Sequence, residues 1–447
     1  MARIYPFRAL RYNPSLVRLQ DVVTQPYDKI TPAMQQAYYQ RSPYNLVRII
    51  LGLPELFDGD GAQDVYQRAG RDFTAWRREG VLAQEGEPCV YAYSQTFAVP
   101  VSAFGVETHC ERRGFIALGE LYDYSAKVVF RHEQTLSRPK SDRLNLLRAT
   151  RAHFGQIFML YSDPGLTAER LLFDSTAAPD IEVTDEYETV HRVWRVSDPS
   201  TINLLTTALE DRKLIIADGH HRYETALQYA REQAPRETPA PAERNPSSAL
   251  QPPYPEAAAM MTFVNMDAQG LVILPTHRVV HSLACFDPAR FLQSVQPYFA
   301  VEPLAMTDPE ALIARLKGAQ GKTAFVAVTS SGNYLLTANE AAVNSTLKDI
   351  PARQRGLDTV QLHALILEKA LGITPEAVSR QTNVRYLRDA AEAMEQVARN
   401  EANLALLMNP VTLDELREVA FAGEVMPQKS TDFFPKLLSG LTIYALD

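Results

Sequence analysis

The chain has 447 residues, of which 46% are hydrophobic and 22% are charged, so it can bury more than one apolar core. It carries 45 Lys and Arg against 53 Asp and Glu, a net charge of -8, which argues against a surface that binds the nucleic acid backbone. Its three cysteines are too few and too scattered for a disulfide framework or a zinc site with paired short spacing.

The sequence also lacks the apolar segments that export or membrane insertion requires. Pro6, Arg8 and Arg11 interrupt the first residues, where a secretory signal would need an apolar stretch. No apolar run approaches the roughly 20 residues that span a bilayer. We therefore expect a cytoplasmic protein whose partners are small molecules rather than membranes or nucleic acid, and the oligomeric state stays open.

The first half of the chain alternates between helical and extended patterns. Helical periodicity predicts helices at residues 64–79, 139–153, 203–210 and 222–231. Strand patterns at 90–99 and 113–119 predict a hairpin or two neighbouring strands, and a short buried strand is predicted at 214–217. Residues 234–255, with seven prolines in 22 positions, are interpreted as a surface loop or as an ordered insertion packed by its prolines.

The second half continues the mixture. Residues 260–265 and 271–280 predict a hairpin, further strands are expected at 323–329 and 333–337, and helices at 309–316, 360–371 and 389–398. The pattern as a whole predicts an α+β fold. We expect an N-terminal α+β region at 1–112, a nucleotide-binding core at 113–232, a Pro-rich loop at 233–256 and a C-terminal α+β region at 257–447.

The residues after the strand at 214–217 predict an anion site. Asp218 and Gly219 stand where a helix begins, and the glycine permits a tight turn or a close backbone approach to a ligand. A helix N-terminus offers unpaired N–H groups and partial positive charge, which favour phosphate. His220, His221 and Arg222 add side-chain donors, and an arginine can grip phosphate oxygens in a bidentate fork.

Asp218 itself would repel a phosphate, so it needs a cation beside it. It could hold Mg²⁺ or pair with the ammonium group of a substrate. The simpler alternative is a helix cap at Asp218 with one histidine in the core. Zinc binding by His220 and His221 is disfavoured, because neighbouring residues at a helix start point in different directions.

Several motifs resemble known families. DGHHRYETA at 218–226 resembles the phosphate-binding motif of the ParB/sulfiredoxin-like superfamily, in particular that of the archaeal ADP-dependent free-serine kinases. VFRHEQTLSRPKSDRLNLL at 129–147 is similar to the segment that carries the proposed general base of those kinases, at the position of Glu133. QPYDKI at 25–30, NMDAQGLVILPTHRVV at 265–280 and MPQKSTDFFPKLLSGL at 426–441 resemble the family called domain of unknown function 1015.

The resemblance implies a ParB/sulfiredoxin-like mixed α/β core, embedded in a larger multi-lobed chain. It implies a kinase that uses ATP or ADP with Mg²⁺ to phosphorylate a small hydroxyl compound, free serine first. A ParB-like regulator that binds CTP or ATP without kinase activity is the alternative, and a sulfiredoxin-like redox enzyme ranks last because His220 stands where its cysteine is expected. Glu133 lies 85 residues before Asp218 (218 minus 133), a wider separation than in the archaeal kinases.

The resemblance also suggests roles for individual residues. Glu133 would be the base, and Asp218 a catalytic group or the Mg²⁺ ligand. The expected phosphate-binding residues are His132, Gly219, His220, His221 and Arg222. Further candidates are Thr135, Lys140, Asp142 and Arg143.

Two of these candidate regions have plainer explanations. At the start of the helix after Pro139, cations oppose the helix dipole unless an anion or a carboxylate is near. The plainer explanation is an ordinary exposed helix start. The loop with Lys429, Thr431 and Lys436 suits contact with a ligand or neighbouring domain, or is simply held by the core residue Phe433 and its neighbour.

Overall fold

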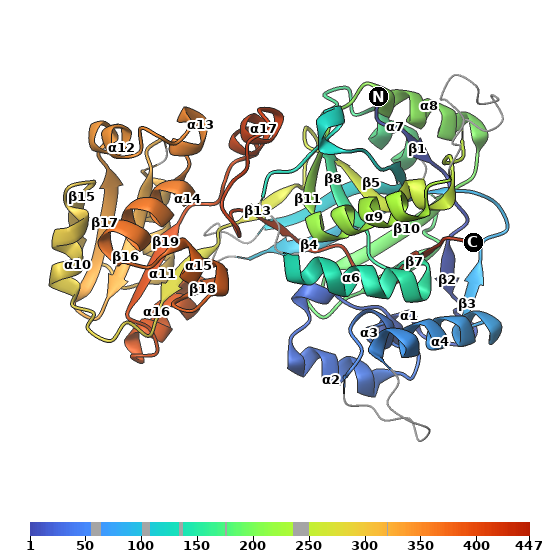
Figure 1. The fold of residues 1–447 in the computed structure, drawn as a ribbon, viewed down its shortest axis with the longest axis horizontal. Coiled ribbons are helices and arrows are strands. Elements are labelled where there is room, and N and C mark those ends of the chain that lie inside the picture. Colours follow the sequence, from blue (N-terminus) through green and yellow to red (C-terminus); the bar gives the residue numbers. More distant parts are fainter. Residues whose placement is uncertain (55–63, 101–107, 134–136, 175–176, 236–249, 320) are drawn as a thin grey trace.

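The structure is a computed structural model that describes residues 1–54, 64–100, 108–133, 137–174, 177–235, 250–319 and 321–447. Figure 1 shows two lobes. The larger lobe holds both chain termini and a nine-stranded sheet, and the smaller lobe holds a six-stranded sheet. Within the described ranges, no helix combines the length and the apolar character needed to cross a membrane.

The large sheet is mixed. Its strand order is β6-β11-β8-β12-β5-β4-β10-β9, with β1 paired to β5. The pairs β6–β11 and β8–β12 are parallel and the others antiparallel. The strands are β1 (Ile4–Tyr5), β4 (Val90–Val99), β5 (Thr108–Glu120), β6 (Val129–Phe130), β8 (Ile157–Tyr161), β9 (Ile181–Thr184), β10 (Val190–Val196), β11 (Leu214–Asp218) and β12 (Ala258–Asn265). The predicted mixed α/β character is therefore confirmed.

Helices cover this sheet. The pair α6 and α9 packs side by side, and α4 packs against α6 (Figure 1). Leu172, Leu205 and Leu209 of α7 and α8 join the buried cluster that contains Ile216 of β11. The helices of this lobe are α1 (Leu19–Val22), α2 (Pro32–Arg41), α3 (Val47–Ile50), α4 (Val65–Arg78), α6 (Ser137–Thr150), α7 (Thr167–Phe173), α8 (Pro199–Glu210) and α9 (His220–Gln233). A small ladder of β2 (Leu10–Tyr12) with β3 (Leu82–Gln84) lies beside them.

The smaller lobe is built on an antiparallel sheet of order β15-β17-β16-β19-β14-β18. Its strands are β14 (His277–Val280), β15 (Phe299–Leu304), β16 (Ala324–Thr329), β17 (Gly332–Ala338), β18 (Val384–Leu387) and β19 (Leu404–Met408). Its helices are α10 (Pro288–Val295), α11 (Pro309–Lys317), α12 (Glu340–Thr346), α13 (Ala352–Arg355), α14 (Asp358–Gln361), the π-helix η6 (Leu362–Ala370), α15 (Pro375–Arg380) and α16 (Ala390–Ala398). Separate apolar clusters form on the two faces of the sheet.

The end of the chain returns to the larger lobe. After α17 (Leu413–Phe421), β20 (Asp432–Phe434) pairs with β13 (Val272–Leu274), and β21 (Tyr444–Ala445) pairs with β7 (Ala152–His153). We call residues 426–441 the C-terminal segment. Its apolar residues Phe433, Leu438 and Leu441 are at most 1% exposed. The chain therefore leaves the larger lobe and comes back to complete its core.

Two sequence predictions need correction. The expected boundary between 112 and 113 falls inside β5, and β12 lies between β5 and β8 although it was placed in the C-terminal region. The predicted hairpin of 260–265 with 271–280 is wrong, because β12 is buried along its whole length and takes neighbours from the large sheet on both sides. Pro275 separates β13 from β14, which pair elsewhere. Residues 236–249 of the expected Pro-rich loop lie outside the described residues.

Candidate active site

The loop between β11 and α9 joins a buried strand to a helix N-terminus, as predicted. Gly219 has a φ of 91°, a left-handed conformation that glycine adopts without steric cost. A Cβ at this position would lie 3.0 Å from the guanidinium carbon of Arg222. The helix begins at His220, and no side chain in the described ranges caps it. Its first backbone N–H groups can therefore receive an anion.

Glu133 follows β6 and lies beside this loop. The strand β6 runs parallel to β11, with Phe130 opposite Ile215. Because parallel strands end at the same edge of a sheet, the residues after β6 meet those after β11. His132 donates from Nδ1 to a backbone carbonyl of β11 at 2.7 Å. Glu133 and Asp218, far apart in the sequence, are thus brought to one edge.

The imidazole rings of His132 and His220 pack against each other. His132 is completely buried, and its ring centroid lies 4.8 Å from that of His220. Burial lowers the pKa of both imidazoles, that of His220 well below its ordinary value. Burial lowers the pKa of His221 as well. The rings are neutral at pH 7, and Nε2 of His220 is buried without a hydrogen-bond partner among the described residues.

Asp218 is surrounded by cations. Arg222 Nη2 lies 2.7 Å from its Oδ2, and Lys436 Nζ lies 3.7 Å from its Oδ1. The same Lys436 ammonium lies 2.9 Å from Asp432 Oδ1. Partial burial would raise the pKa of this carboxyl, but the charges of Lys436, Arg222 and Lys29 hold its pKa well below the ordinary value. Asp218 is therefore a carboxylate at neutral pH.

A buried arginine holds the backbone that carries Lys436. Arg112, only 2% exposed, donates to the carbonyl oxygens of Phe434 at 3.1 Å and Pro435 at 2.5 Å. Gln95 Nε2 donates to the carbonyl of Lys436 at 2.9 Å, and Gln95 Oε1 accepts from Arg112 Nε at 3.0 Å. Side chains of β4 and β5 thus bind three consecutive carbonyls and fix the position of the lysine.

The C-terminal segment also contacts Glu133. Oε1 of Glu133 accepts from the backbone N–H groups of Ser430 and Thr431, both at 3.1 Å, and lies 3.2 Å from Thr431 Oγ1. That hydroxyl also lies 2.7 Å from His132 Nε2. Since Nδ1 of neutral His132 is the donor, the single hydroxyl proton serves either the ring or the carboxylate. In the described part of the chain, Oε2 of Glu133 has no hydrogen-bond partner.

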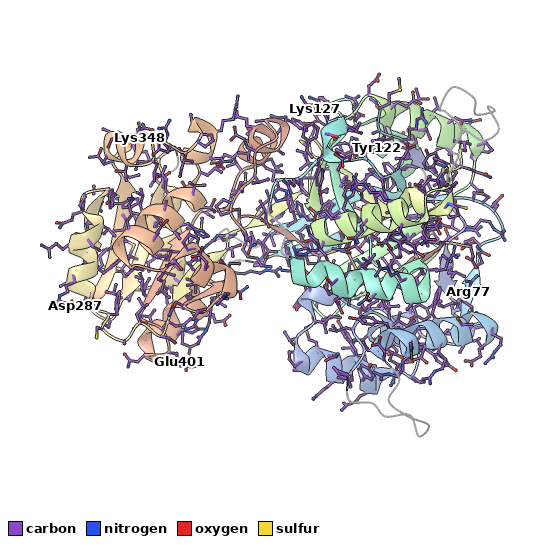
Figure 2. All side chains as sticks on the ribbon, in the orientation of Figure 1. Arg77, Tyr122, Lys127, Asp287, Lys348 and Glu401 are labelled. Carbon is purple, nitrogen blue, oxygen red and sulfur yellow. The ribbon has the colours of Figure 1, made fainter. Side chains whose placement is uncertain are left out.

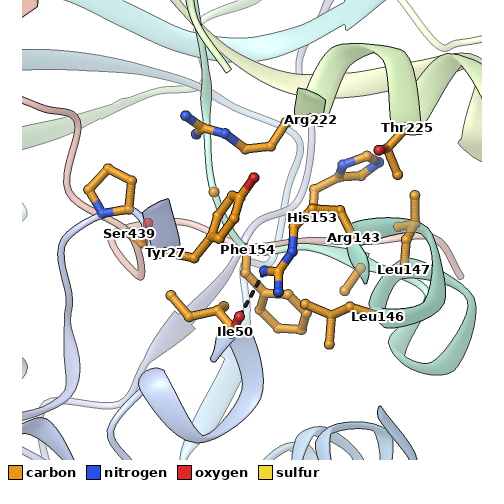
Figure 3. Close-up of a pocket in the computed structure, with 13 residues that line it drawn as sticks. Tyr27, Ile50, Arg143, Leu146, Leu147, His153, Phe154, Arg222, Thr225 and Ser439 are labelled. Carbon is orange, nitrogen blue, oxygen red and sulfur yellow. Dashed lines mark hydrogen bonds between the residues drawn. The ribbon is translucent and has the colours of Figure 1, made fainter. Parts of the chain in front are cut away.

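Arg222 is engaged by the protein itself. Besides Asp218, it binds the backbone carbonyl of Gln156. It lines a cavity of about 70 Å³ together with Tyr27 and Arg143 (Figure 3). The guanidinium of Arg143 lies 4.0 Å from the centroid of the Tyr27 ring. The expected bidentate grip of Arg222 on phosphate would therefore have to replace contacts that it makes here.

The candidates on α6 are paired within the protein. Lys140 forms an ion pair with Glu224 of α9. Asp142 pairs with Arg143 and accepts a hydrogen bond from a tyrosine of α4 at 2.8 Å. The cations at the start of this helix therefore have carboxylates beside them, one of the two explanations that the sequence left open. Thr135 lies outside the described residues.

The donor set for a metal ion is small. Among the described residues, no group of three or more His, Cys, Asp or Glu side chains could hold a metal. Asp218 and Asp432 share Lys436 instead. Mg²⁺ at Asp218 would need most of its oxygen ligands from phosphate or water, as it commonly does in nucleotide sites.

Sequence reasoning did not assign Lys29 or Asp432 to the site, and it left the role of Lys436 open. All three lie in the motifs at 25–30 and 426–441 that carry the family resemblance, and polar residues inside such motifs are the available signal. The pairing of β20 with β13, which brings two of them here, joins residues about 160 positions apart and has no local signature.

A family described as "Protein of unknown function (DUF1015)" matches residues 4–360. The chain belongs to the DUF1015 family. This finding confirms the resemblance inferred from the motifs. The loop at 218–226 of this DUF1015 chain lies within the matched residues, whereas the C-terminal segment lies beyond them. No curated protein matches the chain significantly.

Some solved structures show a distant likeness to the DUF1015 chain. A mutant free serine kinase in complex with ADP is 11% identical, with 68% of this chain and 84% of the kinase covered and a TM-score of 0.33. A conserved hypothetical protein from Pyrococcus furiosus is 12% identical, with 68% and 87% covered and a TM-score of 0.33. SbnI from Staphylococcus aureus, truncated at its C-terminus, is 8% identical, with 72% and 85% covered and a TM-score of 0.34. Likenesses at these TM-scores carry no argument about fold or activity.

Proposed function

We propose that the protein is a nucleotide-dependent kinase that transfers a phosphoryl group to the hydroxyl group of a small metabolite. Free L-serine, which would give O-phosphoserine, is the first acceptor to test, with ATP or ADP as the donor. The unit that performs the reaction would be a ParB/sulfiredoxin-like core within the nine-stranded sheet. A cytoplasmic location is part of the same proposal.

One observation carries the proposal: the parallel pairing of β6 with β11 brings Glu133 to the same sheet edge as the uncapped N-terminus of α9. Phosphoryl transfer needs positive groups around the phosphates and usually a carboxylate near the acceptor hydroxyl. The amides of α9 and the buried Nε2 of His220 suit the phosphate side. Oε2 of Glu133, without a partner among the described residues, suits the hydroxyl side.

In the proposed step, the acceptor oxygen forms a bond to the terminal phosphorus of the nucleotide while the bond from that phosphorus to the bridging oxygen breaks. The hydroxyl proton passes to Glu133, and the shortened nucleotide leaves as an anion. Asp218 would orient the amine of an amino acid acceptor or hold Mg²⁺ together with phosphate oxygens. Either role suits its negative charge.

The proposal requires the site to open. The cavity beside the loop, which Arg222 lines but Glu133 and Asp218 do not, measures about 70 Å³, whereas small-molecule sites commonly measure roughly 300–1,000 Å³. Ser430 and Thr431 contact Glu133 directly, so the loop that holds them, before β20, is the part that would move to admit a nucleotide. Its return would exclude water from the reaction.

The test is a product assay. The full chain is incubated with ATP or ADP, Mg²⁺ and a panel of hydroxyl amino acids, and O-phosphoserine is measured by mass spectrometry. We expect product with the wild type and a loss of at least about a hundredfold in Glu133→Gln, because general bases commonly contribute that much. Glu401→Gln, which changes an exposed carboxylate of the smaller lobe (Figure 2), should keep full activity. Absence of product with every acceptor, or equal rates for the two variants, contradicts the proposal.

A ParB-like nucleotide-binding regulator is the second candidate. The observation that favours it is the set of contacts from Ser430 and Thr431 to Glu133, which gives this carboxylate a structural use without catalysis. CTP or ATP would then bind at α9 and stay intact. Tight CTP binding together with no phosphorylated product would select this candidate over the kinase.

A further inference from the structure

A second cavity lies in the smaller lobe, at the edge of its sheet where β17 and β19 end. Both strands are antiparallel to β16, so they end at the same edge. The cavity measures about 680 Å³, within the common range for small-molecule sites. The helices α12, α13 and α17 around it run along the upper side of that lobe in Figure 1. It is therefore separate from the β11–α9 loop.

A buried amide on its wall lacks a partner for its oxygen. Gln361 is 6% exposed, and its Nε2 donates to the backbone carbonyl of Arg355 at 3.0 Å. Because a carbonyl can only accept, this bond fixes which end of the amide is nitrogen. Oε1 of Gln361 is buried and, among the described residues, has no hydrogen-bond donor. An unmet buried acceptor costs about 1–3 kcal/mol, and a ligand donor would remove that cost once the amide turns its Oε1, now less than 1 Å² exposed, to the cavity surface.

A carboxyl group accompanies this acceptor. Asp358 also lines the cavity, three residues before Gln361 and hence on the same side of the helix. The pKa of Asp358 is raised to about 7, because burial and the charge of Glu415 raise it more than a hydrogen bond from Thr323 lowers it. At neutral pH the group is close to half protonated. A cation placed against it would stabilise its ionised form.

The other charged groups on the cavity wall complete the pattern. Glu415 accepts hydrogen bonds from the Thr412 backbone and hydroxyl at 2.8 Å, so it stays with its own helix. Glu340 is exposed. Lys322 is exposed at the rim, and Arg355 donates to a backbone carbonyl of α12 at 3.2 Å. Groups of both signs of charge thus line the cavity, with Asp358 and Gln361 on one helix and with Lys322 and Arg355 elsewhere on its wall.

We propose that this cavity binds a small zwitterionic amine, such as a free amino acid, with its ammonium group against Asp358 and Gln361. The ammonium group supplies the donor that Oε1 lacks and the positive charge that the carboxyl lacks. The carboxylate of the ligand faces Lys322 and Arg355. Such a ligand satisfies both signs of charge, whereas a simple anion would meet three carboxyl groups.

Binding should be measured on the full chain by isothermal titration calorimetry at pH 7. The probes are glycine, L-serine, L-aspartate, L-lysine and ethanolamine, with acetate and ethylene glycol as probes without an amine. We expect at least one amino acid to bind, and acetate and ethylene glycol not to bind. Because the ligand drives ionisation of Asp358, protons are released, so the heat should differ between phosphate and Tris buffers.

Variants locate the binding. Asp358→Asn and Gln361→Leu should each weaken it at least about tenfold, a change of about 1.4 kcal/mol. Asp349→Asn removes an exposed carboxylate of the same lobe and should bind like the wild type. The proposal is overturned if no amino acid binds, if ethanolamine or acetate binds equally well, or if either Asp358→Asn or Gln361→Leu leaves binding unchanged.

Discussion

Asp218 and Asp358 are the same residue type in opposite surroundings. Arg222 and Lys436 stand beside Asp218 and hold its pKa well below the ordinary value despite partial burial. Burial and Glu415 raise the pKa of Asp358 to about 7. Arg222, the partner of Asp218, lines a cavity of about 70 Å³, whereas Asp358 itself lines one of about 680 Å³. Cations of the chain thus neutralise the charge of Asp218, whereas the charge of Asp358 is left for a ligand to neutralise.

The two regions differ in whether their polar groups find partners within the chain. At Asp218, buried donors hold the C-terminal segment so that its cation reaches the carboxylate. At Asp358, the wall keeps an unmet acceptor and a poised carboxyl. Substitutions should therefore disturb stability at the first region and pH response at the second.

The largest expected effect is that of Arg112→Met. It removes the donors of two buried backbone carbonyls in the C-terminal segment, and an orphaned buried polar group costs about 1–3 kcal/mol. We expect the free energy of unfolding in urea to fall by about 3 kcal/mol. Arg113→Met on the same strand is the control, since this arginine is 45% exposed and should cost less than about 1 kcal/mol. Equal losses would show that Arg112 does not hold the segment.

Lys436→Met should have the next largest effect. It leaves Asp218 and Asp432 without the ammonium that they share, although each keeps an arginine. Removing one partner of a buried ion pair is strongly destabilising, and we expect a loss of about 2 kcal/mol by urea denaturation. Lys348→Met, at an exposed lysine of the smaller lobe (Figure 2), should change little. Similar stabilities of the two variants would show that Lys436 does not stabilise this region.

Asp358→Asn should change stability little below pH 4, where this carboxyl is protonated in the folded and the unfolded chain, and it should change the pH dependence most clearly. A carboxyl whose folded pKa is about 7, against about 4 unfolded, stabilises the fold fully below pH 4 and loses that contribution as pH rises through 7. Wild-type Tm should therefore fall relative to that of Asp358→Asn between pH 5 and pH 8. Parallel Tm curves for the two proteins, measured by scanning calorimetry, would contradict the raised pKa.

The sequence predicted local features of the fold well. The buried run before Asp218, the glycine after it and the helical periodicity that follows are local, so the strand, loop and helix were all found. The role of Glu133 rested on resemblance, and the parallel pairing of β6 with β11 brings it to that loop. The pairing of strands that are distant in the sequence was not predicted. The strand β12 joined the large sheet rather than its neighbour in sequence, because strand pairing depends on distant partners.

The second cavity could not be predicted at all from the sequence. Nothing in the local pattern says that Gln361 is buried or that its oxygen lacks a donor. Nor does it say that Asp358 faces Glu415, since these two groups come from separate helices. Such features follow from tertiary packing alone.

The most direct test of the central claim is ³¹P NMR of ADP titrated with three proteins: wild type, Gly219→Ala and Gly423→Ala. Both glycines have positive φ, but a Cβ at 219 would meet the Arg222 side chain whereas a Cβ at 423 would meet nothing within 4 Å. Each variant thus puts an alanine at a positive φ, at the α9 N-terminus in one case and away from it in the other. We predict that the terminal phosphate signal shifts with wild type and Gly423→Ala, and that Gly219→Ala binds about tenfold more weakly. No shift with wild type, or equal binding by the two variants, would contradict a phosphate site at this loop.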